Sequence, residues 1–160
     1  MRLMLQLYTD LQGKTLPADY RGSIISLCKR ALTAYADGKY FEEFYQGNHT
    51  KAFSFAVGLP KGVRFSQDTI LLPKPESKVT LTISTADPRT AVILSNAFLA
   101  MKGKTHPVKD NVLRIEKVVM IPEKTVSQTG QVMLIRMLAP LCVREHVDHK
   151  DRYITVEDDD

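Results

Sequence analysis

The sequence has few of the residues and motifs that carry metal or nucleotide chemistry. It contains only two cysteines, Cys28 and Cys142, and neither has histidine or cysteine partners at metal-ligand spacing, so we expect no structural zinc site. His146 and His149 are three residues apart, but the charged stretch around them favours a solvated segment. The eight glycines form no phosphate-binding loop, dinucleotide motif or nucleophile elbow. We therefore expect neither a bound metal nor a cofactor.

Long hydrophobic runs are also missing. No apolar run approaches the roughly 20 residues that cross a bilayer. The N-terminal stretch MRLMLQLYTD alternates apolar with polar residues and has no cleavage site of small residues, so it predicts a strand and not a signal peptide. The sequence is 44% hydrophobic and 25% charged, as in soluble globular proteins. We expect a cytoplasmic protein with one domain of about 100 to 150 residues and some length left over.

The charge is unevenly distributed along the chain. The formal net charge is +4, although the last four residues are all acidic, and without these four negative charges it would be +8. A body this basic favours a polyanionic partner such as nucleic acid, because neutralisation of phosphates by Lys and Arg dominates such binding. The alternative is ordinary charge that keeps a protein soluble.

Hydrophobic periodicity predicts an α+β domain over residues 1–122. The predicted helices and strands alternate in the order strand 2–8, helix 20–35, strand 52–58, strand 77–85, helix 88–103 and strand 111–121, with a short second helix at 39–47. Turn signals at 59–75 predict a β-hairpin inserted before the third strand. The order is the βαββαβ arrangement of ferredoxin-like (RRM-like) domains, in which two helices cover one face of a four-stranded antiparallel sheet.

Residues 123–160 do not fit this unit. Residues 125–130 are linker-like, residues 131–143 predict a new apolar strand interrupted at Ala139-Pro140, and the chain then ends in charged residues. We interpret 123–160 as a linker, one strand and a charged tail that begin a second ferredoxin-like domain, so the chain is expected to be a fragment. Exposed apolar residues of such a half domain predict dimerisation or poor solubility.

Several features together resemble a known family. Leu16-Pro17 opens the first helix, the phenylalanine-rich FYQGNHTKAFSFAV follows the short second helix, a basic hairpin comes next, and Ala139-Pro140 lies between the two parts. This combination resembles the N-terminal half of the CRISPR-associated endoribonucleases of the RAMP superfamily (the Cas-six family), which cut precursor CRISPR RNA within its repeats. The resemblance implies repeat RNA as a partner, with a homodimer or a CRISPR effector complex as further assemblies. It also implies metal-independent cleavage that leaves a 2′,3′-cyclic phosphate and a 5′-OH.

Such cleavage needs a base near the 2′-OH, an acid near the leaving 5′-oxygen and a cation over the phosphate. The family often places a His at the end of the short second helix, here Tyr45 or Gln46, and a Lys at the start of the next strand. Lys51 matches that lysine, and the nearby His49 is the candidate base or acid. Members without the His use lysines of the first helix, which makes Lys29 a candidate. The alternative reading is a solvated loop histidine and ordinary surface lysines.

Three further basic residues, Arg21, Lys61 and Arg64, are candidate phosphate contacts that would position RNA without reading its sequence. His106 lies in a predicted turn and is not expected to be catalytic. Two other functions stay open: a repeat-RNA-binding protein that does not cut, and a ferredoxin-like interaction or regulatory domain with no RNA role.

Overall fold

The computed structural model describes residues 2–9, 14–46, 51–122, 143–147 and 150–154, the last two ranges by their backbone. The chain divides into two compact units, Met1–Thr125 and Val126–Asp160, and each is described by itself.

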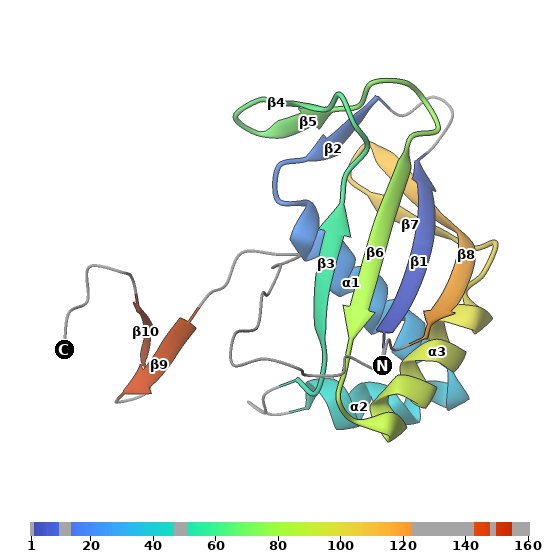
Figure 1. Ribbon diagram of the computed structural model, residues 1–160, viewed down its shortest axis with the longest axis vertical. Helices are drawn as coiled ribbons and strands as arrows, with labels where there is room; N and C mark the ends of the chain where they lie inside the picture. The colour runs from blue at the N-terminus through green and yellow to red at the C-terminus, as the bar shows by residue number, and fades with distance from the viewer. Residues whose placement is uncertain (1, 10–13, 47–50, 123–142, 148–149, 155–160) are drawn as a thin grey trace, which may run out of the picture. The chain divides into compact units, whose positions relative to one another are not determined.

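The first unit is built on a five-stranded antiparallel sheet in the order β3-β6-β1-β8-β7. Two helices, α1 (Tyr20–Ala34) and α3 (Pro88–Ala100), cover one face of this sheet, as Figure 1 shows. The strands are β1 (Arg2–Thr9), β3 (Ser54–Gly58), β6 (Lys78–Ser84), β7 (Thr105–Val108) and β8 (Asn111–Ile121). The predicted α+β, ferredoxin-like fold class is confirmed.

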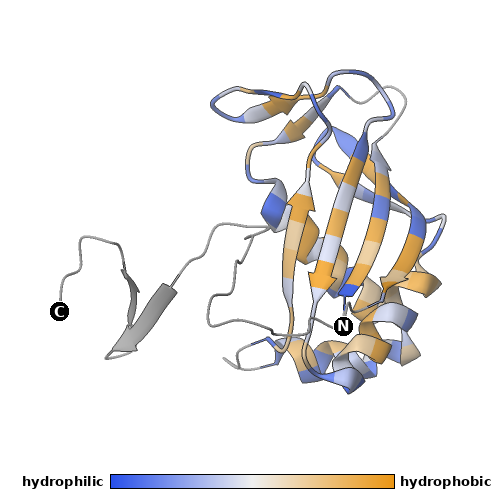
Figure 2. Ribbon diagram, viewed as in Figure 1, coloured by the Kyte–Doolittle hydropathy of each residue, from blue (hydrophilic) through white to orange (hydrophobic). Residues whose placement is uncertain are grey.

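The core lies between the sheet and the two helices. Along β1 every second residue is buried, and Leu5 pairs with Leu81 of β6 on one side and Val118 of β8 on the other. The buried residues of α1 repeat at helical spacing and face this layer: Ile24, Leu27, Cys28, Ala31 and Leu32. Figure 2 shows the hydrophobic residues concentrated in the strands and in α3. The apolar residues that repeat every two positions in the strands and every 3.6 positions in the helices therefore pack together in one core.

The sheet has one strand more than predicted. Residues 105–108 form β7, an edge strand paired with β8, and so His106 is on a strand and not in a turn. Pro107 makes this strand hard to predict from the sequence, because proline has no amide N–H to donate a hydrogen bond to a neighbouring strand and is tolerated mainly at sheet edges. Arg30 of α1 donates a 2.8 Å hydrogen bond to the carbonyl oxygen of Thr105 and so ties the edge to the helix layer.

A small second sheet lies at one end of the main sheet (Figure 1). It consists of β2 (Thr15–Pro17), β5 (Thr69–Leu71) and β4 (Arg64–Phe65), in the order β2-β5-β4. The predicted hairpin is therefore present, and it gains a third strand from the residues just before α1. The amide of Ala18 donates to the carbonyl oxygen of Asp68 at 2.9 Å, which fixes the hairpin beside the start of α1.

The connection after α1 sets the position of the short helix α2 (Lys39–Tyr45). Ala36, Asp37 and Gly38 have φ values of 50°, 52° and 78°. This left-handed stretch, which is easiest for glycine, cannot continue a helix and so reverses the chain. As a result α2 packs against α1, and the chain then leads toward β3 at the edge of the main sheet.

The second unit contains an antiparallel hairpin of β9 (Val143–Val147) and β10 (Lys150–Ile154), which the sequence did not predict. The apolar strand predicted at 131–143 lies almost wholly outside the described residues. Among the described residues, no helix has the length and apolar character needed to span a membrane.

Candidate functional site

Tyr45 occupies the end of α2 and is the centre of the candidate site. Its ring stacks on Phe41, one helical turn earlier, with 5.5 Å between ring centroids. The four-residue spacing brings the two rings onto one side of the helix. Tyr45 is half-buried against the core. The packing therefore holds this ring in place with part of its surface open to solvent.

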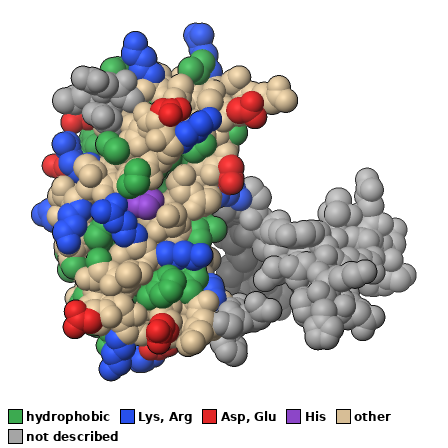
Figure 3. All heavy atoms as spheres, turned by 180° about the vertical axis from the view of Figure 1, so that it is seen from behind, with side chains coloured by type: hydrophobic (Ala, Val, Ile, Leu, Met, Phe, Trp, Pro, Cys, Tyr) green, Lys and Arg blue, Asp and Glu red, His purple; other side chains and the backbone are tan. Residues whose placement is uncertain are grey.

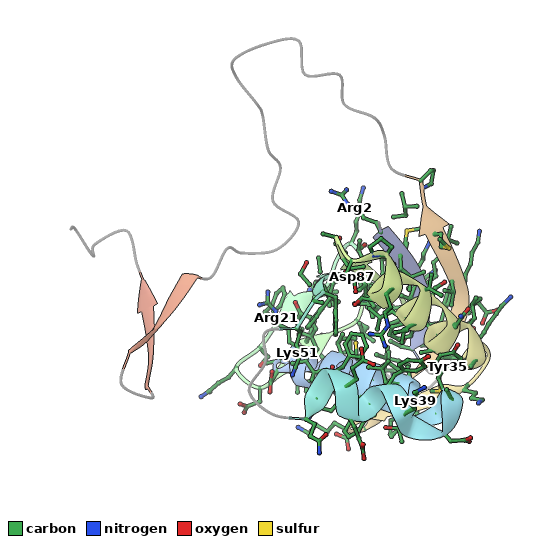
Figure 4. The ribbon with its side chains drawn as sticks, turned by 90° about the horizontal axis from the view of Figure 1, so that it is seen from below. Arg2, Arg21, Tyr35, Lys39, Lys51 and Asp87 are labelled. Atoms are coloured by element: carbon green, nitrogen blue, oxygen red, sulfur yellow. The ribbon has the colours of Figure 1, made fainter. Side chains whose placement is uncertain are left out.

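Two lysines from different parts of the chain lie over that ring. Lys29 projects from the exposed side of α1, and its Nζ is 5.2 Å from the Tyr45 centroid. Lys51 lies just before β3, and its Nζ is 5.0 Å from the same centroid. Both distances are within the range of cation–π contacts. Figure 4 shows Lys51 near one end of α2, with Tyr35 and Lys39 at the other. The two ammonium groups are thus at most about 10 Å apart.

The groups beneath the lysines are uncharged near neutral pH. Burial raises the pKa of Tyr45 to about 12, with a further contribution from Cys28. Burial likewise raises the pKa of the Cys28 thiol to about 12. Tyr45 therefore keeps its proton and can donate a hydrogen bond, while the two lysines supply positive charge. An anion is the natural ligand of such a cluster.

A cavity of about 170 Å³ adjoins Lys51. Its lining has both signs of charge, and consists of Glu43, Phe44, Lys51, Ala52, Asp87, Arg89 and Thr90. This volume is well below that of pockets for drug-sized ligands, so the cavity can admit only a small group beside the lysine.

The acidic groups in that cavity already have partners. Glu43 forms a two-pronged ion pair with Arg89, and one of the contacts, from Nη2 to Oε2, is 2.9 Å. The hydrogen bond from Arg89 lowers the pKa of Glu43. Asp87 accepts from the backbone amides of Arg89 and Thr90 at 3.2 and 2.9 Å, and hydrogen bonds from Thr90 lower its pKa. The first amides of α3 are therefore not free to bind a phosphate.

The structure brings together only some of the predicted site residues. Lys29 and Lys51 share one ring, as described above, while His49 lies outside the described residues. Arg21 is exposed in the first turn of α1, and Lys61 and Arg64 are exposed on the hairpin at the opposite end of the main sheet from α2 (Figure 1).

From the sequence, Tyr45 is expected only as the end of the short second helix. The four-residue spacing from Phe41 to Tyr45 could have indicated that the two rings stack. No local pattern shows that Lys29 reaches the same ring. Within the described residues, no group of three or more His, Cys, Asp or Glu side chains could hold a metal ion.

Comparison with known proteins gives matches only at the level of structure. No protein-family profile and no curated protein sequence matches the chain. A solved structure described as an RAMP protein binding different RNA substrates matches with a TM-score of 0.75 at 15% identity, over 99% of this chain and 64% of that one. The chain has the RAMP/Cas6 fold.

Two further structures carry the same fold. A CRISPR-associated protein Cas6 matches with a TM-score of 0.63 at 15% identity, over 99% of this chain and 63% of its own. A Cas6-related protein from Pyrococcus furiosus matches with a TM-score of 0.66 at 13% identity, over 100% and 63%. The chain thus spans less than two thirds of the length of these RAMP/Cas6 structures. The resemblance expected from the sequence is confirmed for the fold.

Proposed function

We propose that this protein binds RNA through the lysine pair over Tyr45 and cuts it without a metal. The observation that carries the proposal is that Lys29 and Lys51, the two lysines for which the family resemblance implied catalytic roles, converge on one ring in a RAMP/Cas6 fold. The structural neighbours include a protein described as binding different RNA substrates and a Cas6 product complex. The substrate would be CRISPR repeat RNA, by the same resemblance.

The proposed reaction is transfer within one phosphodiester. The 2′-oxygen attacks the adjacent phosphorus, a new bond forms between O2′ and phosphorus, and the bond to O5′ breaks. The 2′-OH proton passes to a base, and O5′ takes a proton from an acid, leaving a 2′,3′-cyclic phosphate and a 5′-OH. Lys29 and Lys51 stabilise the negative charge that develops on the phosphate oxygens. Tyr45, which holds its proton, donates a hydrogen bond to the same group. His49, two residues before Lys51 in the sequence, remains the candidate base or acid.

A second candidate function is binding of repeat RNA without cleavage. It is favoured by one observation: Tyr45 occupies the helix end where the family resemblance implies a histidine, and a phenol with a pKa near 12 is a poor proton acceptor or donor near neutrality. A homodimer and membership of a CRISPR effector complex remain predictions from the sequence, as does an interaction domain with no RNA role.

Cleavage of repeat RNA in excess EDTA distinguishes these functions. We expect wild type to produce a 2′,3′-cyclic phosphate, and RNA with a 2′-deoxy sugar at the cut site to stay intact, because the nucleophile is missing. Lys51→Ala or Lys29→Ala should slow cutting by about 100-fold or more, and His49→Ala should stop it. Lys39→Ala is the matched control, because Lys39 lies 5.8 Å from the Tyr40 ring in the same kind of contact at the other end of α2.

Three results would contradict the nuclease. Cutting of the 2′-deoxy RNA would exclude attack by the 2′-oxygen. Tight binding of RNA with no cutting by any variant would favour the non-catalytic protein, and no binding at all would leave the interaction domain.

A further inference from the structure

Phe65 is unusual among the exposed apolar side chains of the first unit. It is 70% exposed, the highest value among the large exposed hydrophobic residues of the described chain, and it is the only aromatic one among them. Most of the ring surface faces solvent, although Phe65 pairs across the β4–β5 ladder with Ile70, which is fully buried. The aromatic ring is therefore available for another contact.

The surroundings of Phe65 are basic. Arg64 precedes it on β4, and Lys61 lies in the turn before that strand; both are exposed. Asp68 is the single acidic residue between 59 and 72. An exposed ring beside cations matches the requirements of a single-stranded nucleic acid, whose bases stack on aromatic rings while its phosphates contact Lys and Arg. A protein partner would not need the flanking cations.

Helix α1 connects this hairpin with the lysine pair. Its first residues lie beside the hairpin, since the amide of Ala18 donates to Asp68. Arg21, Ile25 and Lys29 follow at four-residue spacing, which places them along one side of α1, and all three are exposed. With a rise of 1.5 Å per residue, Arg21 and Lys29 are about 12 Å apart along the helix. A strand of a few nucleotides can follow this side of α1.

We propose that Phe65 stacks on a base of single-stranded RNA, as a second contact point for RNA held at the lysine pair. The RNA then runs from Lys29 along α1, past Arg21, to the hairpin, where Arg64 and Lys61 contact phosphates near the stacked base. Because every base has a flat aromatic face, this contact strengthens binding without selecting sequence. The inference rests on the proposed RNA-binding function and adds to it a site that is separate from the chemistry.

The chain contains no tryptophan, which allows a direct test. Phe65→Trp introduces a single reporter at the hairpin, and Leu99→Trp introduces one at a matched control position, 49% exposed on α3. Titration with an unstructured single-stranded RNA should quench the emission of the first variant and leave the second unchanged. In parallel, the anisotropy of labelled RNA should show that Phe65→Ala weakens binding by about 5-fold to about 100-fold, and that Leu99→Ala does not.

The outcomes separate this inference from the proposed function. Binding of RNA by wild type, with no quenching of the indole emission of Phe65→Trp and no loss of affinity in Phe65→Ala, would overturn the stacking site and leave RNA binding intact. Absence of RNA binding by wild type would overturn both. If Phe65→Ala instead dissolved a dimer seen by light scattering, the ring would belong to an interface between copies, and the inference would be wrong. Circular dichroism checks that each variant is folded.

Discussion

At the scale of single residues, two positively charged lysine side chains, which repel each other, lie against the Tyr45 ring. Lys29 and Lys51 approach the same centroid at 5.2 and 5.0 Å. The ring attracts each ammonium, but the attraction is modest where water has access, and the two ammonium groups repel. A bound phosphate would offset this repulsion, because its negative charge attracts both ammonium groups. This arrangement supports the anionic ligand proposed above.

His106 illustrates how burial affects a titratable residue. The side chain is only 4% exposed, and its Nδ1 has no hydrogen-bond partner among the described residues. Burial, and then the positive charge of Arg30, lowers the pKa of His106 below its usual range. The folded protein therefore disfavours the protonated form, whereas the unfolded chain takes up the proton at the ordinary pKa of about 6.5.

This environment predicts a loss of stability in acid. As pH falls below about 6.5 and through the lower pKa of the folded state, the unfolded chain binds the proton more readily, so the free energy of unfolding decreases. His106→Leu removes this proton and should lose less stability than wild type between about pH 7 and about pH 5. Urea unfolding midpoints at the two pH values measure the difference. Equal losses in the two proteins would contradict the assignment, since the acidic residues contribute equally to both.

The sequence indicated both lysines of the site but not their common ring. Lys51 was predicted from its position before a strand and Lys29 from the edge of an apolar stripe, through a family resemblance. Their contact depends on the reversal at residues 36–38, which folds α2 back against α1. Ala36 and Asp37 have positive φ there, a conformation that is uncommon for residues other than glycine and is therefore hard to predict from the sequence. A contact between residues far apart in sequence could not be read from local pattern.

At the scale of elements, the long helices and the four longest strands of the main sheet could be predicted, because each has a clear hydrophobic period. The missed strands of the first unit, β2 and β7, have three and four residues and contain Pro17 and Pro107. Such short strands contain too few alternations for a period, and their pairing is fixed by partners far along the chain.

The start of α3 provides a stability prediction at this scale. Asp87 caps two backbone amides at 3.2 and 2.9 Å, whereas Asp19 at the start of α1 caps one at 3.4 Å. Asp87→Ala should therefore lower the thermal midpoint by a few degrees, and by more than Asp19→Ala. Asp87→Ser should recover most of the loss, because serine also caps helices well. Thermal unfolding followed by circular dichroism measures all three variants.

Either of two results would contradict this account of the cap. Equal midpoints for Asp87→Ala and Asp19→Ala would show that the second amide contributes nothing. Failure of Asp87→Ser to recover stability would assign the effect to the charge near Arg89 and not to the cap.

At the scale of the whole molecule, the charge distribution constrains how RNA can bind. Seen from behind (Figure 3), Lys and Arg side chains are spread over the first unit with Asp and Glu among them. The formal net charge is +4. The face seen in Figure 3 is therefore mixed in charge, and we expect the proposed affinity for RNA to depend on particular groups of lysines and arginines, such as the pair over Tyr45. Removing lysines that contact RNA should weaken RNA binding more than removing the same number of lysines elsewhere on the surface.

The most direct test of the central claim is the salt dependence of binding to single-stranded RNA. For single strands, the slope of log affinity against log salt is about −0.7 for each phosphate contact. Lys29→Ala/Lys51→Ala should therefore reduce the magnitude of the slope by about 1.4, whereas Lys39→Ala/Lys102→Ala, which removes the same charge, should leave it unchanged. That result would place RNA phosphates on the pair over Tyr45. The same slope for wild type and for the Lys29→Ala/Lys51→Ala variant would contradict the account.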